Sequence, residues 1–256
     1  MKLSPWHQKQ LVKIESITDI SGKIFVEIGG DLNSDVLKYA IHKGAKKAIG
    51  FNPKYKAKSS IPNIELVQDY FDEKAVNYVI DGADIIFGAA VLEHVNDFNS
   101  LFMGIQSIFN NRGIGLLHGG PIWTSNVGHH VWVNSSNTWY TFNNALGGKN
   151  PINPWEHLIL NQNEMLDTLI KQRNIAMQDA LKIVEWIYNS TALNRISYNS
   201  LRKLFDSTAQ VNLIGIDEVL SAPPTVAIAE RITSTTNYEY NELRVAQATF
   251  LFSSNI

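Results

Sequence analysis

The stretch KIFVEIGGDLNSD, residues 23–35, decides the fold. It is an apolar, β-rich run that ends in paired glycines, and residues 34–45 follow it with the apolar spacing of a helix. Paired glycines let the backbone pass close to a ligand because no Cβ stands in the way. We therefore expect a strand, a tight turn and a helix, with a ligand at the turn. A purely structural turn is the alternative.

The alternation of strand and helix continues to residue 120. Strand-like runs are expected at 47–53, within 61–70, from 83 and at 112–120, with helical runs at 71–80 and 98–111. Strands that alternate with helices through short polar turns are typical of a parallel sheet with helices on both faces. Ligands of such sheets bind outside the carboxyl ends of the strands. The residues just after each strand are therefore the candidates for the site.

The glycine turn does not match the common nucleotide motifs. GGDLNS lacks the spacing G-x-G-x-x-G, and the chain has no phosphate loop with G-K-[ST], so a nicotinamide-dependent reductase is disfavoured. The acidic side chains of Glu27 and Asp31 would repel a pyrophosphate. They would suit a ligand that carries an amino group and a sulfonium cation.

The later strand ends carry polar or small residues. Asn52 can donate and accept hydrogen bonds without a charge, and Asp69 stands where an exocyclic amine could be read. Small residues follow the fourth strand, and then comes His94, which could face a pocket or pack at a helix start.

The ordered series VEIGGD, GFNP, LVQDYF and DIIFGAAVLEHV, within residues 20–120, resembles the class I S-adenosylmethionine (SAM)-dependent methyltransferases. The segment AVLEHV is especially similar to the small-molecule and glycan enzymes of that family. The resemblance implies an α/β fold with a Rossmann-like sheet of seven strands, the last antiparallel, and SAM across the strand ends. By position it implies a cofactor-binding set of Glu27, Gly29, Gly30, Asp31, Asn52, Asp69, Tyr70 and Ala89.

Two residues depart from the family pattern. Asp31 stands where a small residue is usual in the glycine loop, and Asn52 stands where Asp or Glu usually binds the ribose. The amide of Asn52 can still bridge the two hydroxyls of a ribose, so we expect weaker binding of SAM than a carboxylate would give, but not a loss of binding. The alternative is a catalytically inactive SAM-fold module that binds or regulates.

The second half adds a helical insertion. Residues 121–150 are aromatic and polar without a helical period, which suits a substrate-facing loop. Helical runs follow from 154, at 174–190 and at 196–208; a short helix is expected at 223–232, between strands at 210–220 and 243–253. We expect a SAM-binding core at 1–150, a helical lid at 151–208 and two strands that complete the core at 209–256.

The histidines of TSNVGHHVWVN, residues 124–134, are the candidates for catalysis. The order GHHVW…PWEHL more loosely resembles a subgroup that includes polyketide synthase methyltransferase domains with a catalytic metal. Three roles stay open for His129, His130 and His157: a general base, ligands of a divalent metal such as Fe or Mn, or structural residues. Gln162 or Glu156 would add an oxygen ligand. Because neighbours in an extended segment point to opposite sides, one metal requires a bend, which Gly128 permits.

The composition limits which binding partners and which chemistry the protein can have. The net charge of −2 gives no electrostatic reason for a nucleic-acid partner, and the absence of cysteine excludes disulfides and thiolate chemistry. No apolar run suits a signal peptide or a membrane span, so we expect a cytoplasmic protein. The expected acceptor is a small or carrier-bound molecule of natural-product type, methylated on oxygen or, next, carbon. Several aromatic side chains could form the walls of the acceptor pocket or, as the alternative, part of the core: Trp123, Trp132, Trp139, Tyr140, Trp155, Trp186 and Tyr188.

Overall fold

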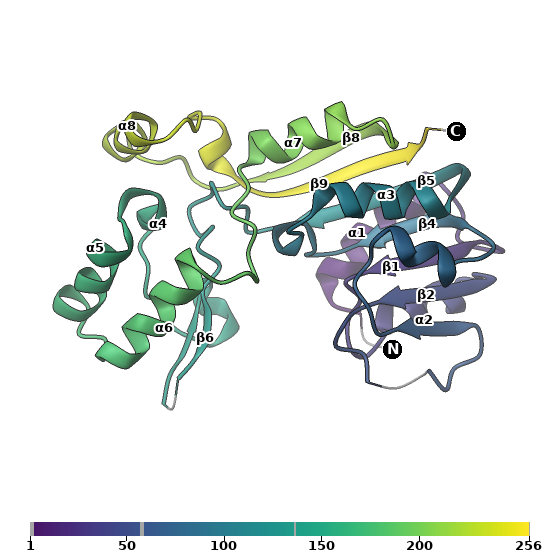
Figure 1. Ribbon diagram of the computed structural model, residues 1–256, viewed down its shortest axis with the longest axis horizontal. Helices are drawn as coiled ribbons and strands as arrows, with labels where there is room; N and C mark the ends of the chain where they lie inside the picture. The colour runs from purple at the N-terminus through teal and green to yellow at the C-terminus, as the bar shows by residue number, and fades with distance from the viewer. Residues whose placement is uncertain (1–2, 57–58, 136, 256) are drawn as a thin grey trace. The chain divides into compact units, whose positions relative to one another are not determined.

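The computed structural model of the protein describes residues 3–56, 59–135 and 137–255. Its helices are α1 (Pro5–Glu15), α2 (Asp35–His42), α3 (Phe98–Ile108), α4 (Glu156–Ile159), α5 (Gln162–Asp167), α6 (Met177–Tyr188), α7 (Tyr198–Ser207) and α8 (Val226–Thr235) (Figure 1). Its strands are β1 (Ile24–Ile28), β2 (Lys47–Phe51), β3 (Ile64–Val67), β4 (Ala83–Gly88), β5 (Phe109–Gly119), β6 (Trp132–Asn134), β7 (Trp139–Thr141), β8 (Val211–Leu220) and β9 (Val245–Ser254).

The main sheet has seven strands in the order β3-β2-β1-β4-β5-β9-β8. The neighbours from β3 to β5 pair in parallel, and β9 is antiparallel. The sheet order confirms the predicted α/β fold of the class I methyltransferases.

The chain forms two compact units. Unit 1 comprises the described residues of 1–119, 203–217 and 249–256, and unit 2 comprises 120–202 and 218–248. Residues 120–150, which the sequence assigns to the core, thus belong to the same unit as α4 to α6. The role of the helices as a lid stays a prediction.

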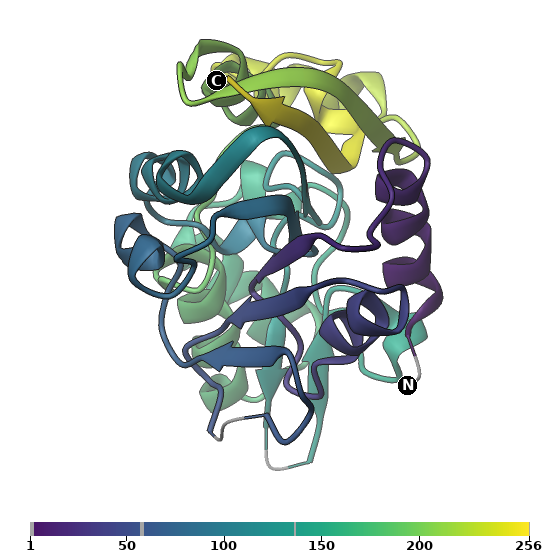
Figure 2. The same cartoon turned by 90° about the vertical axis from the view of Figure 1, so that its right-hand side faces the viewer.

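Unit 1 is organised around β1, whose five residues are all buried. The helices α1 and α2 cover one face of the parallel strands and α3 the other (Figure 2). Phe25 of β1 and Phe87 of β4 pack with their ring centroids 5.9 Å apart, and Leu37 of α2 belongs to the same apolar cluster. The apolar spacing of residues 34–45 therefore predicted the buried face of α2 correctly.

Two local predictions differ from the structure, and one helix was not expected. The helix expected at 71–80 is only a 3₁₀ turn, Glu73–Asn77, because α3 packs closely here: a Cβ at Gly104 would lie 2.5 Å from the carbonyl oxygen of Asp72. The loop expected at 121–150 contains the β6–β7 hairpin. The helix α1, whose first turn is capped by Ser4 ahead of Pro5, was not expected.

Unit 2 has its own apolar core. Residues of the β6–β7 hairpin, α5 and α6 form one cluster that includes Val131, Met165, Ile183 and Ile187, all fully buried. A smaller cluster joins Trp155, next to α4, with α8. Trp123, Tyr140, Trp186 and Tyr188 pack in or against the first cluster, so these aromatic residues contribute to the core.

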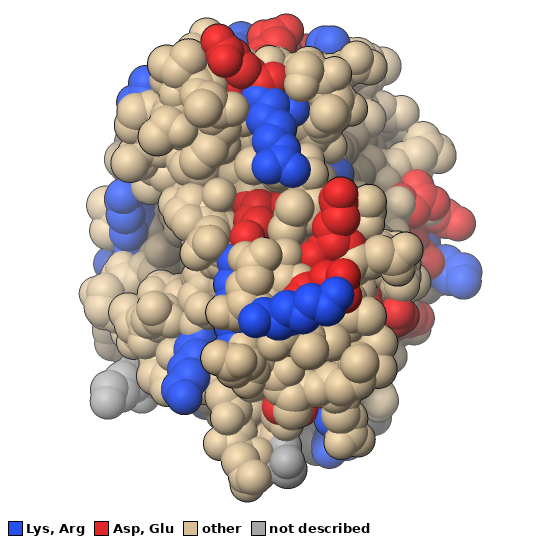
Figure 3. All heavy atoms as spheres, turned by 90° about the vertical axis from the view of Figure 1, so that its left-hand side faces the viewer, with Lys and Arg blue, Asp and Glu red and all other residues tan. Residues whose placement is uncertain are grey.

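Two surface properties follow from the described residues. None of their helices combines the length and the apolar character that crossing a bilayer requires. Figure 3 shows one face, on which basic and acidic side chains are interspersed over a largely uncharged surface. That face offers no continuous basic area to a polyanion.

Candidate functional site

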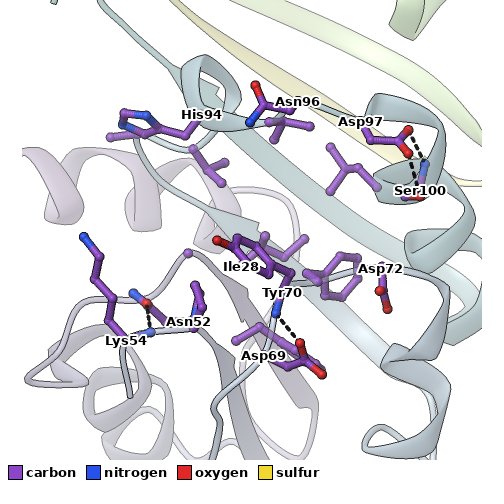
Figure 4. Close-up of a pocket in the computed structure, with 18 residues that line it drawn as sticks. Ile28, Asn52, Lys54, Asp69, Tyr70, Asp72, His94, Asn96, Asp97 and Ser100 are labelled. Carbon is purple, nitrogen blue, oxygen red and sulfur yellow. Dashed lines mark hydrogen bonds between the residues drawn. The ribbon is translucent and has the colours of Figure 1, made fainter. Parts of the chain in front are cut away.

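A cavity of about 530 Å³ lies in unit 1 at the carboxyl ends of β1, β2 and β4 (Figure 4). This volume falls within the roughly 300–1,000 Å³ of typical small-molecule sites. Its lining comprises Ile28, Gly29, Phe51, Asn52, Pro53, Lys54, Asp69, Tyr70, Phe71, Asp72, Ala90, Val91, His94, Val95, Asn96, Asp97, Ser100 and Leu101.

Four of the eight predicted cofactor residues line this cavity: Gly29, Asn52, Asp69 and Tyr70. The other four, Glu27, Gly30, Asp31 and Ala89, are not among its lining residues. Ala90 lines the cavity in place of its neighbour Ala89, which packs against the apolar cluster of unit 1. The predicted residues that do not line the cavity still shape it, as their contacts show.

The turn after β1 is closed tightly. The backbone N–H groups of Gly29 and Gly30 donate to the carbonyl oxygen of Phe51 at 2.9 and 3.3 Å. Gly29 has a φ of +72°, which favours glycine. A Cβ at Gly30 would overlap the hydroxyl oxygen of Tyr55 and lie 2.6 Å from Oε2 of Glu27. Only glycine therefore fits at position 30 without a shift of its neighbours.

Asp31 closes the start of α2. Its carboxylate accepts hydrogen bonds from the backbone N–H groups of Asn33 at 2.7 Å and Asp35 at 3.0 Å. In dinucleotide-binding folds this helix end takes a phosphate. Here the chain's own carboxylate satisfies these donors, so the turn is not built for an anionic ligand.

Asn52 ties the end of β2 to the glycine turn. Its Nδ2 donates to the carbonyl oxygen of Gly30 at 2.6 Å, and its Oδ1 accepts from the backbone N–H of Lys54 at 2.8 Å. A carboxylate could not donate the first of these bonds. The departure from Asp or Glu at this position therefore has a structural reason.

Glu27 is a buried carboxyl beneath the turn, with 2% of its surface exposed. Desolvation, and then the nearby charge of Asp31, raises the pKa of Glu27 well above its usual value, although the backbone N–H of Asp31 donates to it. Its Oε2 has no hydrogen-bond partner among the described residues. A cation close to the turn would compensate this carboxyl.

The far wall of the cavity comes from the loops after β3 and β4. Asp69 accepts a hydrogen bond from the backbone N–H of Tyr70, whose ring is 73% exposed and stands over the cavity between Asp69 and His94 in Figure 4. The loop before α3 adds Asn96 and Asp97, which sequence reasoning missed. Asp97 caps α3 through the backbone N–H of Ser100 at 3.0 Å, and this N-cap pattern was the available signal.

Of the three predicted catalytic histidines, His129 and His157 lie together in unit 2. They are 0% and 2% exposed, and their ring centroids are 5.5 Å apart. Nδ1 of His129 accepts from the backbone N–H of Val131 at 3.2 Å, so its neutral ring carries the proton on Nε2. Nε2 of His157 lies 2.8 Å from the carbonyl oxygen of Trp123 and donates to it, which leaves a lone pair on Nδ1.

Burial keeps both rings neutral. Desolvation lowers the pKa of His129 well below its usual value, and the charges of His157, His130 and Arg173 lower it further. Desolvation also lowers the pKa of His157, to about 4. Neither imidazole therefore takes up a proton readily near neutral pH.

His130 has a different environment from its neighbour. The chain bends at this residue, with a φ of +43° and a hydrogen bond from its N–H to the carbonyl oxygen of Val127. The half-buried ring lies edge-on to Phe142 with a centroid distance of 4.5 Å. The bend thus lies at His130 itself, and the two histidines have different surroundings.

Three of the candidate metal ligands are already engaged within the chain. The acceptor nitrogen of His129 is already bonded, and Gln162 is exposed with its Nε2 donating to Asn189 at 3.0 Å. The carboxylate of Glu156 is paired with Arg173. His157, with one ring nitrogen on a backbone carbonyl, has the arrangement usual for a ligand.

Comparisons with known proteins support the fold. No protein-family model matches the chain, and a search of curated proteins finds no match. An S-adenosylmethionine-dependent methyltransferase from Mesorhizobium loti is similar, with 13% identity, 95% of this chain and 96% of that chain covered, and a TM-score of 0.52. The YcgJ protein from Bacillus subtilis has 10% identity, 97% and 98% coverage, and a TM-score of 0.50. At such identity the likeness concerns the fold.

Gly30→Ala should lower the free energy of unfolding by about 1–3 kcal/mol, because its methyl group overlaps Tyr55 and Glu27. Tyr55→Phe removes the hydroxyl and should recover part of this loss in the double variant, as measured by urea unfolding. Gly215→Ala is the control, since a Cβ there has open space. Strictly additive effects of the two substitutions would contradict the described contact.

His157→Gln should reduce the amount by which the free energy of unfolding falls as the pH is lowered. The pKa of His157 in the folded state, about 4, lies below the ordinary 6.5, so the unfolded chain binds more protons between these values. The associated stability is complete above 6.5 and is lost as pH falls toward 4, by on the order of 3 kcal/mol.

Gln keeps a donor for the carbonyl oxygen of Trp123 without titrating. Urea unfolding at several pH values, with exposed His42→Gln as control, measures the difference. If the free energy of unfolding had the same pH dependence in wild type and His157→Gln, the pKa of His157 would not be lowered in the folded protein.

Proposed function

We propose that the protein is a methyltransferase that uses SAM and acts on a small-molecule or carrier-bound acceptor. The observation that carries this proposal is the cavity at the carboxyl ends of the strands, bordered by the backbone of Gly29 and by Asp69. It lies in a sheet with the strand order of SAM-dependent methyltransferases.

The chain's residues suit the parts of this donor. Gly29 offers a backbone that a ligand can approach, and the carboxylate of Asp69 can accept from an exocyclic amine. The buried carboxyl of Glu27, beneath the turn, favours a cation nearby, whereas Asp31 occupies the helix end that a phosphate would need. When bound, SAM would supply an activated methyl group. The protein's task is then to hold the donor and acceptor in line and to exclude water.

We further propose that a histidine of unit 2 removes the acceptor's proton, and that His130 is this residue. Its ring is half-buried, whereas His129 and His157 are fully buried with lowered pKa values. Imidazole is the side chain that most often acts as a general base in proteins. An oxygen acceptor fits this base best and a carbon acid comes next.

A second candidate is a module that binds SAM without catalysis. Asn52 favours it, because both ends of its amide are already bonded within the chain, at Gly30 and Lys54. Fewer groups are then left to grip the ribose. Such a module would bind SAM and its demethylated product with similar affinity and would show no turnover.

SAM and its demethylated product should bind the full chain in calorimetric titration, and NAD(H) should not. Asp69→Ala should weaken binding roughly 10–150-fold, since a hydrogen bond to a charged group contributes roughly 1.5–3 kcal/mol. Asp81→Ala, an exposed acid that does not line the cavity, is the matched control. Binding of NAD(H) without SAM would contradict the proposal.

His130→Gln should slow methyl transfer by about 10²–10⁴-fold, the usual contribution of a general base, and should leave SAM affinity unchanged. Release of the demethylated product in an acceptor screen of alcohols, phenols and carbon acids measures the rate, with His42→Gln as control. Equal rates for His130→Gln and wild type would remove His130 from the mechanism.

A further inference from the structure

A second hollow lies on unit 2, between the β6–β7 hairpin and α6, which run beside each other in Figure 1. Its volume is about 580 Å³ and it is open to solvent. The side chains that matter for its chemistry are Trp132, Trp186, Lys182, Glu185, Asn189 and Ser190. We call it the tryptophan groove.

The two indoles of the tryptophan groove are held in place although one is exposed. Trp132 is 44% exposed, yet its ring stands edge-on to Trp139 with centroids 4.9 Å apart. Trp186 is fixed by its Nε1, which donates to the carbonyl oxygen of His130 at 2.8 Å. A rigid aromatic surface offers a large contact area to a ligand at a small entropic cost.

The polar side chains of the groove are oriented by one another. Oε2 of Glu185 accepts from Nδ2 of Asn189 at 2.8 Å, and Oδ1 of Asn189 accepts from Gln162 at 3.0 Å. Each keeps further capacity, because a carboxylate has about four acceptor sites and an amide nitrogen has two hydrogens. Lys182 adds an ammonium group, so the lining contains one cation and one anion.

We propose that the tryptophan groove binds an uncharged saccharide ring. The apolar C–H face of a pyranoside can stack on the indole of Trp132, while its hydroxyls meet donors and acceptors of Lys182, Glu185 and Asn189. A phosphorylated ligand would meet the carboxylate of Glu185. A wholly apolar ligand would desolvate Lys182 and Glu185 without compensation. The site is separate from the cavity of unit 1 and does not rest on methyl transfer.

The test is calorimetric titration of the full chain with the methyl glycosides of glucose, galactose and mannose. At least one should bind saturably in the millimolar range or more tightly. Trp132→Ala should weaken this binding at least tenfold, and Glu185→Gln should weaken it severalfold while keeping the shape of the side chain. Tyr240→Ala, an equally exposed aromatic outside the groove, should leave it unchanged.

Circular dichroism and SAM titration of each variant separate this proposal from folding defects and from the proposed function, since both readouts should match wild type. The proposal is overturned if no glycoside binds saturably, or if binding survives Trp132→Ala unchanged. It is also overturned if the apolar probe benzyl alcohol binds in a Trp132-dependent manner while the glycosides do not, which would assign the groove to an apolar partner.

Discussion

The absence of a side chain at Gly30 is the constraint on which the site depends. The space that a Cβ would occupy is taken by the hydroxyl of Tyr55 and the carboxyl of Glu27. Because these groups come from the loop after β2 and from β1 itself, the glycine turn is clamped between two neighbouring strands. The position of Gly29 at the cavity wall, and hence the opening at the strand ends, follows from this packing.

The two departures from the methyltransferase pattern belong to the same clamp. Asp31 accepts hydrogen bonds from the backbone N–H groups of Asn33, just before α2, and of Asp35, its first residue, and Asn52 donates to the carbonyl oxygen of Gly30. Each of these two side chains therefore holds the glycine turn in place through its own hydrogen bonds. The residues that would mark a degenerate site in sequence thus stabilise its geometry. What they change is the ligand surface, since one hydrogen and one lone pair of the Asn52 amide are already engaged within the chain.

Sequence reasoning was reliable where one periodic run decides an element. The buried run of β1 and the apolar stripe of α2 indicated the sheet. The strand-end rule indicated Asp69 as a cavity residue, and the family resemblance indicated Tyr70. It did not find β6 and β7, because each has only three residues and an alternation of apolar and polar residues can be recognised only in a longer segment. It could not find the hydrogen bond from Asn52 to Gly30 or the contact of Tyr55 with Gly30, which join residues more than twenty positions apart. Nor could it separate His129 from His130, whose surroundings differ through a left-handed bend.

The most direct test of the central claim is a crystal structure of the protein with S-adenosylhomocysteine. The account predicts density for the amino-acid end along the backbone of Gly29 and for the adenine amine beside the carboxylate of Asp69, with Tyr55 still packed against Gly30. Density for the ligand elsewhere, or a rearranged turn whose side chains fill the cavity, would contradict it.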